Sequence, residues 1–475
     1  MKKKFIRDIS ASSSQMIINQ VSGLIAFYII SSYLDKSSFG EINWALAVLL
    51  AAFNILSCGI DNVSIRKIAS GADAKSLLSI NLWHVFFSGI LFYGLLFASQ
   101  LIFPGFVRQY HLLLFFGISR LLIFFSTPFK QVATGMEKFR LVMIMSICST
   151  VTRAAGLFLL ALLHDVTINT IIITFIVSSI AELIVCLYIT YKLLGVPIRI
   201  SWDKRRWLGL LKESFPQLGV VIFDAAIARF DWIFLGILAS SIILADYSFA
   251  YKIFELSTLP MLIVAPLLIP RFTRLFKTQP VNYNDKINDL FIFIRLEMII
   301  ASLIAVVMNI CWAPVIDLIT NGKYGAVNIH TILILSASMP FLYMNNFLWT
   351  INFAQGKLKM IFWITTVTFL INVISDLVLI PFFSAEGAAA AYLLAIMIQS
   401  ILYLRKTQLA GLKTAWFPLL ICPTSALLGG ILSMLLFQHI FLVLLTSLVI
   451  YFIGVMLTKQ IRLDDWKAFR RVIGI

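Results

Sequence analysis

The chain has 475 residues, of which 60% are hydrophobic and only 13% are charged, and its mean hydropathy is +0.96. A soluble domain cannot bury that much apolar surface, and no long polar segment could form a separate globular domain. The composition therefore predicts an all-α polytopic membrane protein and excludes a soluble one.

The N-terminal residues MKKKFIRD are basic, but a polar stretch follows them, so we expect no cleavable signal peptide. A helix needs about 20 mainly apolar residues to cross the hydrocarbon core, and this criterion gives about fourteen candidate spans. In chain order they are 15–34, 42–60, 78–101, 112–130, 141–163, 168–192, 214–239, 246–270, 290–316, 329–352, 360–382, 386–404, 415–437 and 439–458.

The net charge of +16 suggests a nucleic-acid surface only until the charges are placed. With the N-terminus in the cytoplasm, most of the 38 Lys and Arg residues fall in cytoplasmic segments. Only Lys36, Arg108 and Lys323 fall in outer segments, a distribution that follows the positive-inside rule. We therefore predict a multi-pass membrane protein with both termini in the cytoplasm and no nucleic-acid partner.

The chain is predicted to consist of two halves. Residues 1–192 would form an N-terminal six-helix bundle and residues 214–405 a C-terminal one, with an amphipathic cytoplasmic linker at 193–213 between them. Residues 406–475 would supply spans thirteen and fourteen and a basic tail. The linker alternates Trp202 and Trp207 with basic residues, a pattern typical of a segment at an anionic membrane surface.

A weak internal repeat supports this division. The stretches ATGMEK (133–138) and AQGKLK (354–359) both read A-x-G-x-x-K, and each follows the same span of its half. Because six is an even number, both halves have the same orientation, as in transporters with parallel repeats and a substrate site between them.

Ionisable residues inside the predicted spans are the main candidates for function. A central charge costs roughly 3 kcal/mol on insertion scales, so it is expected to face water, another charge or an ionic substrate. We interpret four cations as a cationic cavity that binds substrate: Arg120, Arg153, Arg229 and Lys252. Four carboxylates are candidates for binding a coupling H⁺ or Na⁺: Asp224, Asp231, Glu182 and Glu255.

Several of these charges have a simpler interpretation, in which they pair between helices and hold the bundle together. Lys252 and Glu255 are three residues apart and share a helix face. Asp224 and Asp231 also share a face, while Arg229 points away from both. Arg295 and Glu297 begin a span and are expected to be interfacial.

Catalytic and cofactor motifs are absent from the sequence. It has no phosphate-binding G-x-x-x-x-G-K-[ST] loop, no H-E-x-x-H and no C-x-x-C, and it has no large outer loop. Its five cysteines have no paired spacing and are expected to be small buried hydrophobes. We therefore expect no metal site, no cofactor and no enzymatic activity.

Three segments resemble one family, the polysaccharide repeat-unit exporters or O-antigen flippases of the multidrug/oligosaccharidyl-lipid/polysaccharide exporter superfamily. They are residues 33–69, beginning YLDKSSFG, residues 228–272, beginning ARFDWIFLG, and residues 351–395, beginning INFAQGK. The chain departs from the family pattern at Asp246, where Gly is usual, and at residues 382–384, where a basic-Tyr-Gly loop is common.

This resemblance implies a MATE-like fold of two six-helix bundles facing each other, with the extra C-terminal pair forming a groove for a lipid tail. It implies movement of an undecaprenyl-diphosphate-linked oligosaccharide from the cytoplasmic to the outer leaflet by alternating access. The diphosphate would bind near Arg120, Arg153 and Arg229, and polysaccharide polymerases would be partners.

Two other functions stay open. A cation-coupled multidrug antiporter of the same superfamily would use Asp224, Asp231 and Glu182, although the three arginines would repel its substrates. A scaffold for polymerase partners would require the embedded charges to pair with each other.

Overall fold

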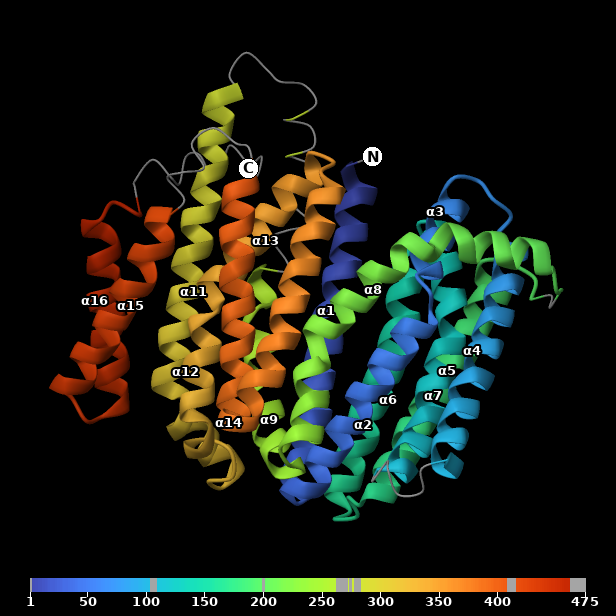
Figure 1. Ribbon diagram of the computed structural model, residues 1–475, viewed down its shortest axis with the longest axis horizontal. Helices are drawn as coiled ribbons and strands as arrows, with labels where there is room; N and C mark the ends of the chain where they lie inside the picture. The colour runs from blue at the N-terminus through green and yellow to red at the C-terminus, as the bar shows by residue number, and fades with distance from the viewer. Residues whose placement is uncertain are drawn as a thin grey trace. The chain divides into compact units, whose positions relative to one another are not determined.

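The computed structural model describes residues 2–102, 109–198, 201–261, 272, 276, 283–407 and 416–461. Within helices, the side chains of residues 2–13, 216–217, 220–222, 224–228 and 283–291 lie outside the description. Every regular element in the described ranges is helical, and none is a strand (Figure 1). The all-α prediction is confirmed.

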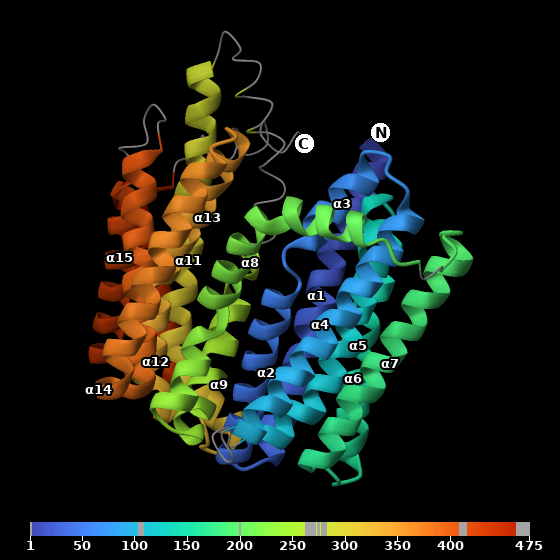
Figure 2. The ribbon, with the colours of Figure 1, turned by 45° about the vertical axis from the view of Figure 1, so that its right-hand side comes forward.

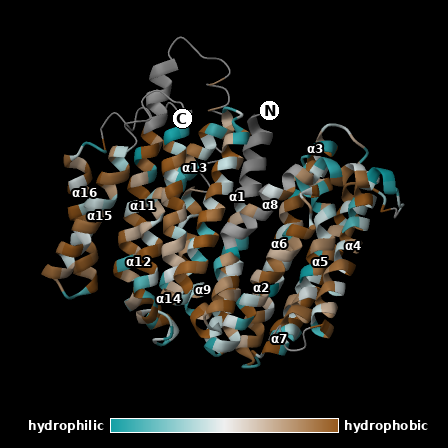
Figure 3. Cartoon of the chain, in the orientation of Figure 1, coloured by the Kyte–Doolittle hydropathy of each residue, from teal (hydrophilic) through white to brown (hydrophobic). Residues whose placement is uncertain are grey.

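Eleven described segments are long and apolar enough to cross a membrane by length and composition. Figure 3 shows apolar residues along most of the length of helices such as α4 (Ala74–Ile102) and α16 (Ile440–Leu457). The predicted spans at 214–239 and 246–270 fall on α8 (Lys204–Leu238) and α9 (Ser241–Ser257), and both spans are only partly described. The count of fourteen therefore stays a prediction.

Helix α14 (Leu358–Lys406) covers two predicted spans, 360–382 and 386–404. Ser384 interrupts it with non-helical angles of φ 52° and ψ −123°. A Cβ added at Gly387 would lie 2.4 Å from the carbonyl oxygen of Leu379, although eight residues of straight helix would separate the two by roughly 12 Å. The chain therefore turns sharply between the two spans, at the position where the sequence lacks the family's usual loop.

The chain divides into two compact units, Met1–Ala245 and Asp246–Ile475, called here the N-terminal and C-terminal units. The division predicted from sequence, with a linker at 193–213 between bundles, stays a prediction.

The N-terminal unit is a helical bundle in which α5 packs against α2, α3, α4 and α7, and α1 packs against α6 (Figures 1 and 2). Besides α4 and α8 it contains α1 (Lys2–Tyr33), α2 (Lys36–Leu56), α3 (Ile60–Ala69), α5 (Tyr110–Gly135), α6 (Phe139–Leu162), α7 (Ile168–Tyr188) and a π-helical turn (Ile189–Leu193).

Three of its helices begin at side chains that cap free backbone N–H groups. Asp35 accepts from Ser38 N before α2, and Asp203 accepts from Arg206 N before α8. Thr167 and Thr170 form a reciprocal capping box before α7. Because the first N–H groups of a helix have no partner within it, these residues determine where each helix starts.

The predicted second span, 42–60, is interrupted before its end. Cys58 and Gly59 both have positive φ (52° and 68°), so the chain turns between α2 and α3. The carbonyl of Leu56, freed by this break, lies 2.8 Å from Nε2 of His84 and accepts a hydrogen bond of 3.3 Å from Ser88. These contacts from α4 satisfy the helix end.

The first turns of α8 run across the ends of neighbouring helices beside α3 (Figures 1 and 2). Glu213 pairs there with Lys67 and Arg66 of α3, each at 2.6 Å, and the contact with Lys67, then that with Arg66, lowers the pKa of Glu213. Rings from α4, from Trp202 just before α8 and from Trp207 in its first turn contact one another; those on α4 are Trp83, Phe86 and Phe87. The aromatic residues of the predicted amphipathic segment therefore pack against α4.

In the C-terminal unit, α11 packs against four other helices. The unit contains most of α9, then α11 (Tyr283–Thr320), a 3-10 turn (Ala326–Asn328), α12 (Ile329–Ala337), α13 (Met339–Ala354), α14, α15 (Trp416–Leu436) and α16. The C-terminal pair contacts α11 closely, since the hydroxyl of Tyr451 on α16 donates to Ile299 O at 2.9 Å.

The repeated motif A-x-G-x-x-K ends a helix in both units, with the same hydrogen bonding. Lys138 N donates to Ala133 O at 2.9 Å in the first, and Lys357 N donates to Asn352 O at 3.0 Å in the second. The left-handed residue is Glu137 in one and Gly356 in the other, so the turns are displaced by two positions within the motif.

Candidate functional site

Three of the predicted embedded charges meet inside the N-terminal unit. Arg120 lies on α5, Arg153 on α6 and Glu182 on α7, and Glu182 interacts electrostatically with both arginines. The Glu182 side chain is buried, and both arginines are half-buried. These residues lie on three consecutive helices, and the packing of α5 and α6 against α7 brings them together.

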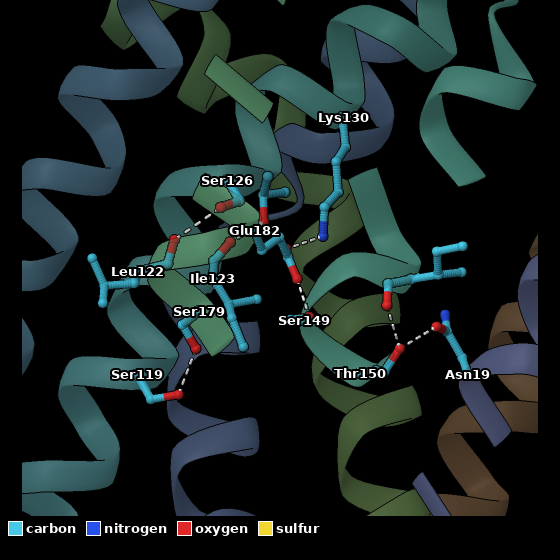
Figure 4. Close-up of polar contacts among 12 residues, drawn as sticks. Asn19, Ser119, Leu122, Ile123, Ser126, Lys130, Ser149, Thr150, Ser179 and Glu182 are labelled. Carbon is cyan, nitrogen blue, oxygen red and sulfur yellow. Dashed lines mark hydrogen bonds and ion pairs between the residues drawn. The ribbon is translucent and has the colours of Figure 1, made fainter. Parts of the chain in front are cut away.

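A fourth charge, Lys130, was not among the predicted site residues. Its Nζ forms an ion pair with Oε1 of Glu182, and the hydroxyl of Ser149 donates to Oε2 (Figure 4). The predicted span ended at residue 130, whereas α5 continues to Gly135. Lys130 is therefore within the helix, with its side chain only 21% exposed.

Hydroxyl groups form hydrogen bonds between the helices that carry these charges. The Ser119 hydroxyl on α5 lies within hydrogen-bonding distance of the Ser179 hydroxyl (2.7 Å) and of the Phe175 carbonyl (3.0 Å) on α7, so it joins the two helices. On the opposite side of α6, the Thr150 hydroxyl donates to Asn19 of α1 at 2.8 Å (Figure 4). These short side chains allow close helix contact while satisfying their own polar atoms.

Arg153 is placed by an aromatic ring. Its guanidinium carbon lies 4.1 Å from the centroid of the Phe175 ring, a cation–π distance. Its Nε atom is buried and has no hydrogen-bond partner within the described ranges. The stacking orients the guanidinium while leaving this donor unused.

The four charges do not cancel. Arg120, Lys130 and Arg153 supply three positive charges and Glu182 one negative charge, which leaves +2 in this cluster. We call these four residues the cationic cluster. Such an excess charge inside a membrane bundle favours binding of an anion, and the planar forks of two arginines suit phosphate oxygens.

The predicted site residues on α8 are arranged differently. The guanidinium carbon of Arg229 lies 4.6 Å from the ring centroid of Trp232, and Asp231 is buried and accepts from Trp232 N at 2.8 Å. The side chain of Asp224 lies outside the described residues.

Lys252 and Glu255, predicted to share a face, form an ion pair within α9, with Nζ 2.8 Å from Oε2. Each is half-buried, and each neutralises the other in this conformation. Their roles in substrate binding and ion coupling stay predictions.

Glu297 was expected to be interfacial, and its depth in the membrane stays a prediction; it lies on α11 inside the C-terminal unit and is only 4% exposed. The cause is the dense packing of four helices around α11.

Among the described residues, no group of three or more His, Cys, Asp or Glu side chains could hold a metal ion, and the five cysteines are free thiols.

Comparison of the structure with solved ones shows which known fold the chain has. The chain is similar to a structure described as "Lipid II flippase MurJ, inward closed conformation" (TM-score 0.73, 14% identity, 98% of this chain and 99% of that chain). It is also similar to the inward-facing conformation of a multidrug resistance MATE family transporter (TM-score 0.66, 13% identity, 86% and 98%). A third match is a MOP superfamily transporter from Pyrococcus furiosus (TM-score 0.59, 12% identity, 88% and 96%).

Residues 5–276, more than half of the chain, match the family described as polysaccharide biosynthesis protein, and the chain belongs to that family. Comparison with curated protein sequences gave no match. The MATE-like fold and the family resemblance drawn from three sequence segments are confirmed.

Proposed function

We propose that the protein is a flippase for lipid-linked oligosaccharides. It would move undecaprenyl-diphosphate-linked repeat units, of O-antigen or a related polysaccharide, from the cytoplasmic to the outer leaflet by alternating access. Membership of a polysaccharide biosynthesis family and a fold shared with a lipid II flippase support this proposal.

The cationic cluster is the observation that carries the proposal. A diphosphate esterified at both ends has two negative charges, and the cluster has two positive charges in excess. Arg120 and Arg153 would bind phosphate oxygens through their N–H groups, while Lys130 would contribute a point charge. The sugars and the prenyl chain would then lie in water and in lipid respectively.

Glu182 has a defined role in this mechanism. In the empty protein its carboxylate balances one of three cations, which lowers the cost of keeping them in the membrane. An arriving diphosphate competes with Glu182 for Lys130. Glu182 therefore weakens binding enough for the substrate to leave on the other side.

The alternative is a cation-coupled multidrug antiporter, supported by the similarity to a multidrug resistance transporter and by the buried carboxylate of Asp231. The cationic cluster favours the flippase, because a lipophilic cation entering near Arg120, Lys130 and Arg153 would be repelled. Glu182, the carboxylate nearest to them, is already paired with Lys130.

Thermal unfolding of the purified protein distinguishes the two functions. We expect undecaprenyl diphosphate to raise the unfolding temperature, while undecaprenol without the diphosphate and tetraphenylphosphonium do not. A ligand at 100 times its Kd stabilises by about 2.7 kcal/mol, which is readily measured. Stabilisation by the lipophilic cation alone would favour the antiporter and overturn the proposal.

The remaining features follow from this function. We place the protein in the bacterial inner membrane with both termini in the cytoplasm, in contact with polysaccharide polymerases. It would act by transport alone, without enzymatic chemistry, and α15 and α16 would guide the prenyl chain.

A further inference from the structure

Glu297 is a buried carboxyl group that the proposed site does not use. It lies on α11 in the candidate span Ile292–Thr320, and its side chain is 4% exposed. Among the described residues, neither of its carboxyl oxygens has a hydrogen-bond partner. A buried, unpartnered carboxyl group is rare in proteins and needs a chemical reason.

The two deeply buried glutamates have opposite surroundings. Glu182 has a lysine on one oxygen, a hydroxyl on the other and two arginines nearby. Glu297 has none of these. An ionised carboxylate without partners costs many kcal/mol in a medium of low dielectric constant, whereas the neutral acid costs far less. The surroundings of Glu297 therefore favour the neutral acid, which carries a proton.

In the part of the chain that the structure describes, the titratable groups on the helices packed against α11 do not supply a cation. On α13, Tyr343 interacts electrostatically with Glu297, but its hydroxyl donates to Ser257 O at 2.9 Å. On α16 and α15 the corresponding groups are Tyr451, which donates to Ile299 O, and the buried thiol Cys422.

The remaining charges near this helix are directed elsewhere. His330 of α12 follows the far end of α11, more than 20 residues and roughly 30 Å along the helix from Glu297. Arg295 precedes Glu297 by two positions, so it points about 200° around α11 from it.

We propose that Glu297 is a proton-binding site of the C-terminal unit and that its proton is exchanged during transport. A carboxylate exposed to water takes up one proton, the neutral acid is stable in this buried state, and the proton leaves when the group again meets water. Proton binding does not depend on the cargo, whereas its coupling to transport rests on the proposed flippase function.

Infrared spectroscopy of the purified protein tests proton binding directly. We expect the C=O stretch of a protonated carboxylic acid at pH 7 in the wild type, and its loss in Glu297→Gln. Glu386→Gln is the matched control, because Glu386 is exposed on α14 and should leave the band unchanged. An identical band in wild type and Glu297→Gln would overturn the proposal.

Glu297→Asp provides a second variant if Glu297→Gln does not accumulate. A shift of the same band in Glu297→Asp supports the assignment, and an unchanged band contradicts it.

Coupling is tested in proteoliposomes with an imposed pH gradient. The rate of lipid-linked oligosaccharide movement should respond to the gradient in the wild type and in Glu386→Gln, by up to about tenfold per pH unit for one proton. In Glu297→Gln the ratio of rates with and without the gradient should fall to about 1. A gradient response that persists in Glu297→Gln contradicts the coupling. Absence of any movement in the wild type, with the infrared result intact, contradicts the flippase function but leaves the proton site in place.

Discussion

At Glu182 one carboxylate binds Lys130 and Ser149 and lies near two arginines, so its removal should change how strongly the cluster attracts anions. We predict that Glu182→Gln binds undecaprenyl diphosphate more tightly. Removing one negative charge about 10 Å away at an effective dielectric constant of 20 is worth roughly 1–2 kcal/mol, or about tenfold in Kd. Titrating the lipid against the unfolding temperature measures this change, and slower transport should accompany it. Weaker binding by Glu182→Gln would contradict the role of Glu182 as a competing counter-ion.

Lys130 should matter for stability as well as for binding. Lys130→Ala leaves Glu182 buried without its paired cation, and breaking such a pair from one side costs about 3–5 kcal/mol. We therefore predict a large loss of thermal stability in Lys130→Ala and partial recovery in the double variant with Glu182→Gln. By contrast, Arg120→Ala should fold and lose function. Equal unfolding temperatures for Lys130→Ala and the double variant would show that the ion pair contributes nothing.

For single residues, the sequence identifies which charged side chains lie inside the predicted spans, but not which of them contact one another. Arg120, Arg153 and Glu182 were recognised because apolar residues surround them. Lys130 was missed because the predicted span stopped at it, and because sequence does not reveal that α5 faces α7. The burial of Glu297 could not be predicted for a related reason: its place at the start of a span indicates its depth in the membrane, whereas only helix packing shows that it is buried.

At the scale of elements, the break between α2 and α3 has a titratable group beside it. Asp61, on α3 and outside the candidate spans, accepts a hydrogen bond from Gln131, whose side-chain oxygen accepts from Asn81 at 2.7 Å. Burial raises the pKa of Asp61 to about 6, from an ordinary value of 3.8. The folded protein thus binds this proton more tightly than the unfolded chain does.

Because the folded protein binds this proton more tightly than the unfolded chain, protonation of Asp61 stabilises the fold. The stabilising contribution of Asp61 is fully present below pH 3.8 and is lost as pH rises through about 6. The difference corresponds to at most about 3 kcal/mol. We predict that Asp61→Asn unfolds at a higher temperature than the wild type at pH 8, and that the advantage shrinks as pH falls towards 4. A constant difference in unfolding temperature between Asp61→Asn and the wild type across this pH range would contradict the raised pKa of Asp61.

Helix boundaries show what local sequence can predict. Asp35, Thr167 and Asp203 cap the helices that follow them, and such starts are visible in the residues themselves. The break after Leu56 was not predicted, because Cys58 and Gly59 lie in an apolar stretch that satisfies the criterion for a span. The turn at Ser384 was predicted from the gap between two spans.

At the scale of the whole molecule, composition and hydropathy were sufficient for the fold class. An apolar chain with short connections must satisfy its backbone within helices, which leaves a helical bundle. Short motifs were sufficient for the family: two of the three segments, 33–69 and 228–272, lie within residues 5–276, which match it. The substrate cannot be predicted in the same way. Its recognition depends on a few side chains contributed by several helices, and these are known only once the helices are packed.

The central claim is that the cationic cluster enables a lipid-linked oligosaccharide to cross the membrane. In a strain that lacks the protein, we would measure in which leaflet the undecaprenyl-diphosphate-linked repeat unit accumulates. We expect accumulation on the cytoplasmic side, rescued by the wild type and by Arg405→Ala, a change at an exposed arginine of α14, but not by stably expressed Arg120→Ala. Normal delivery to the outer leaflet in the absence of the protein would contradict the flippase function.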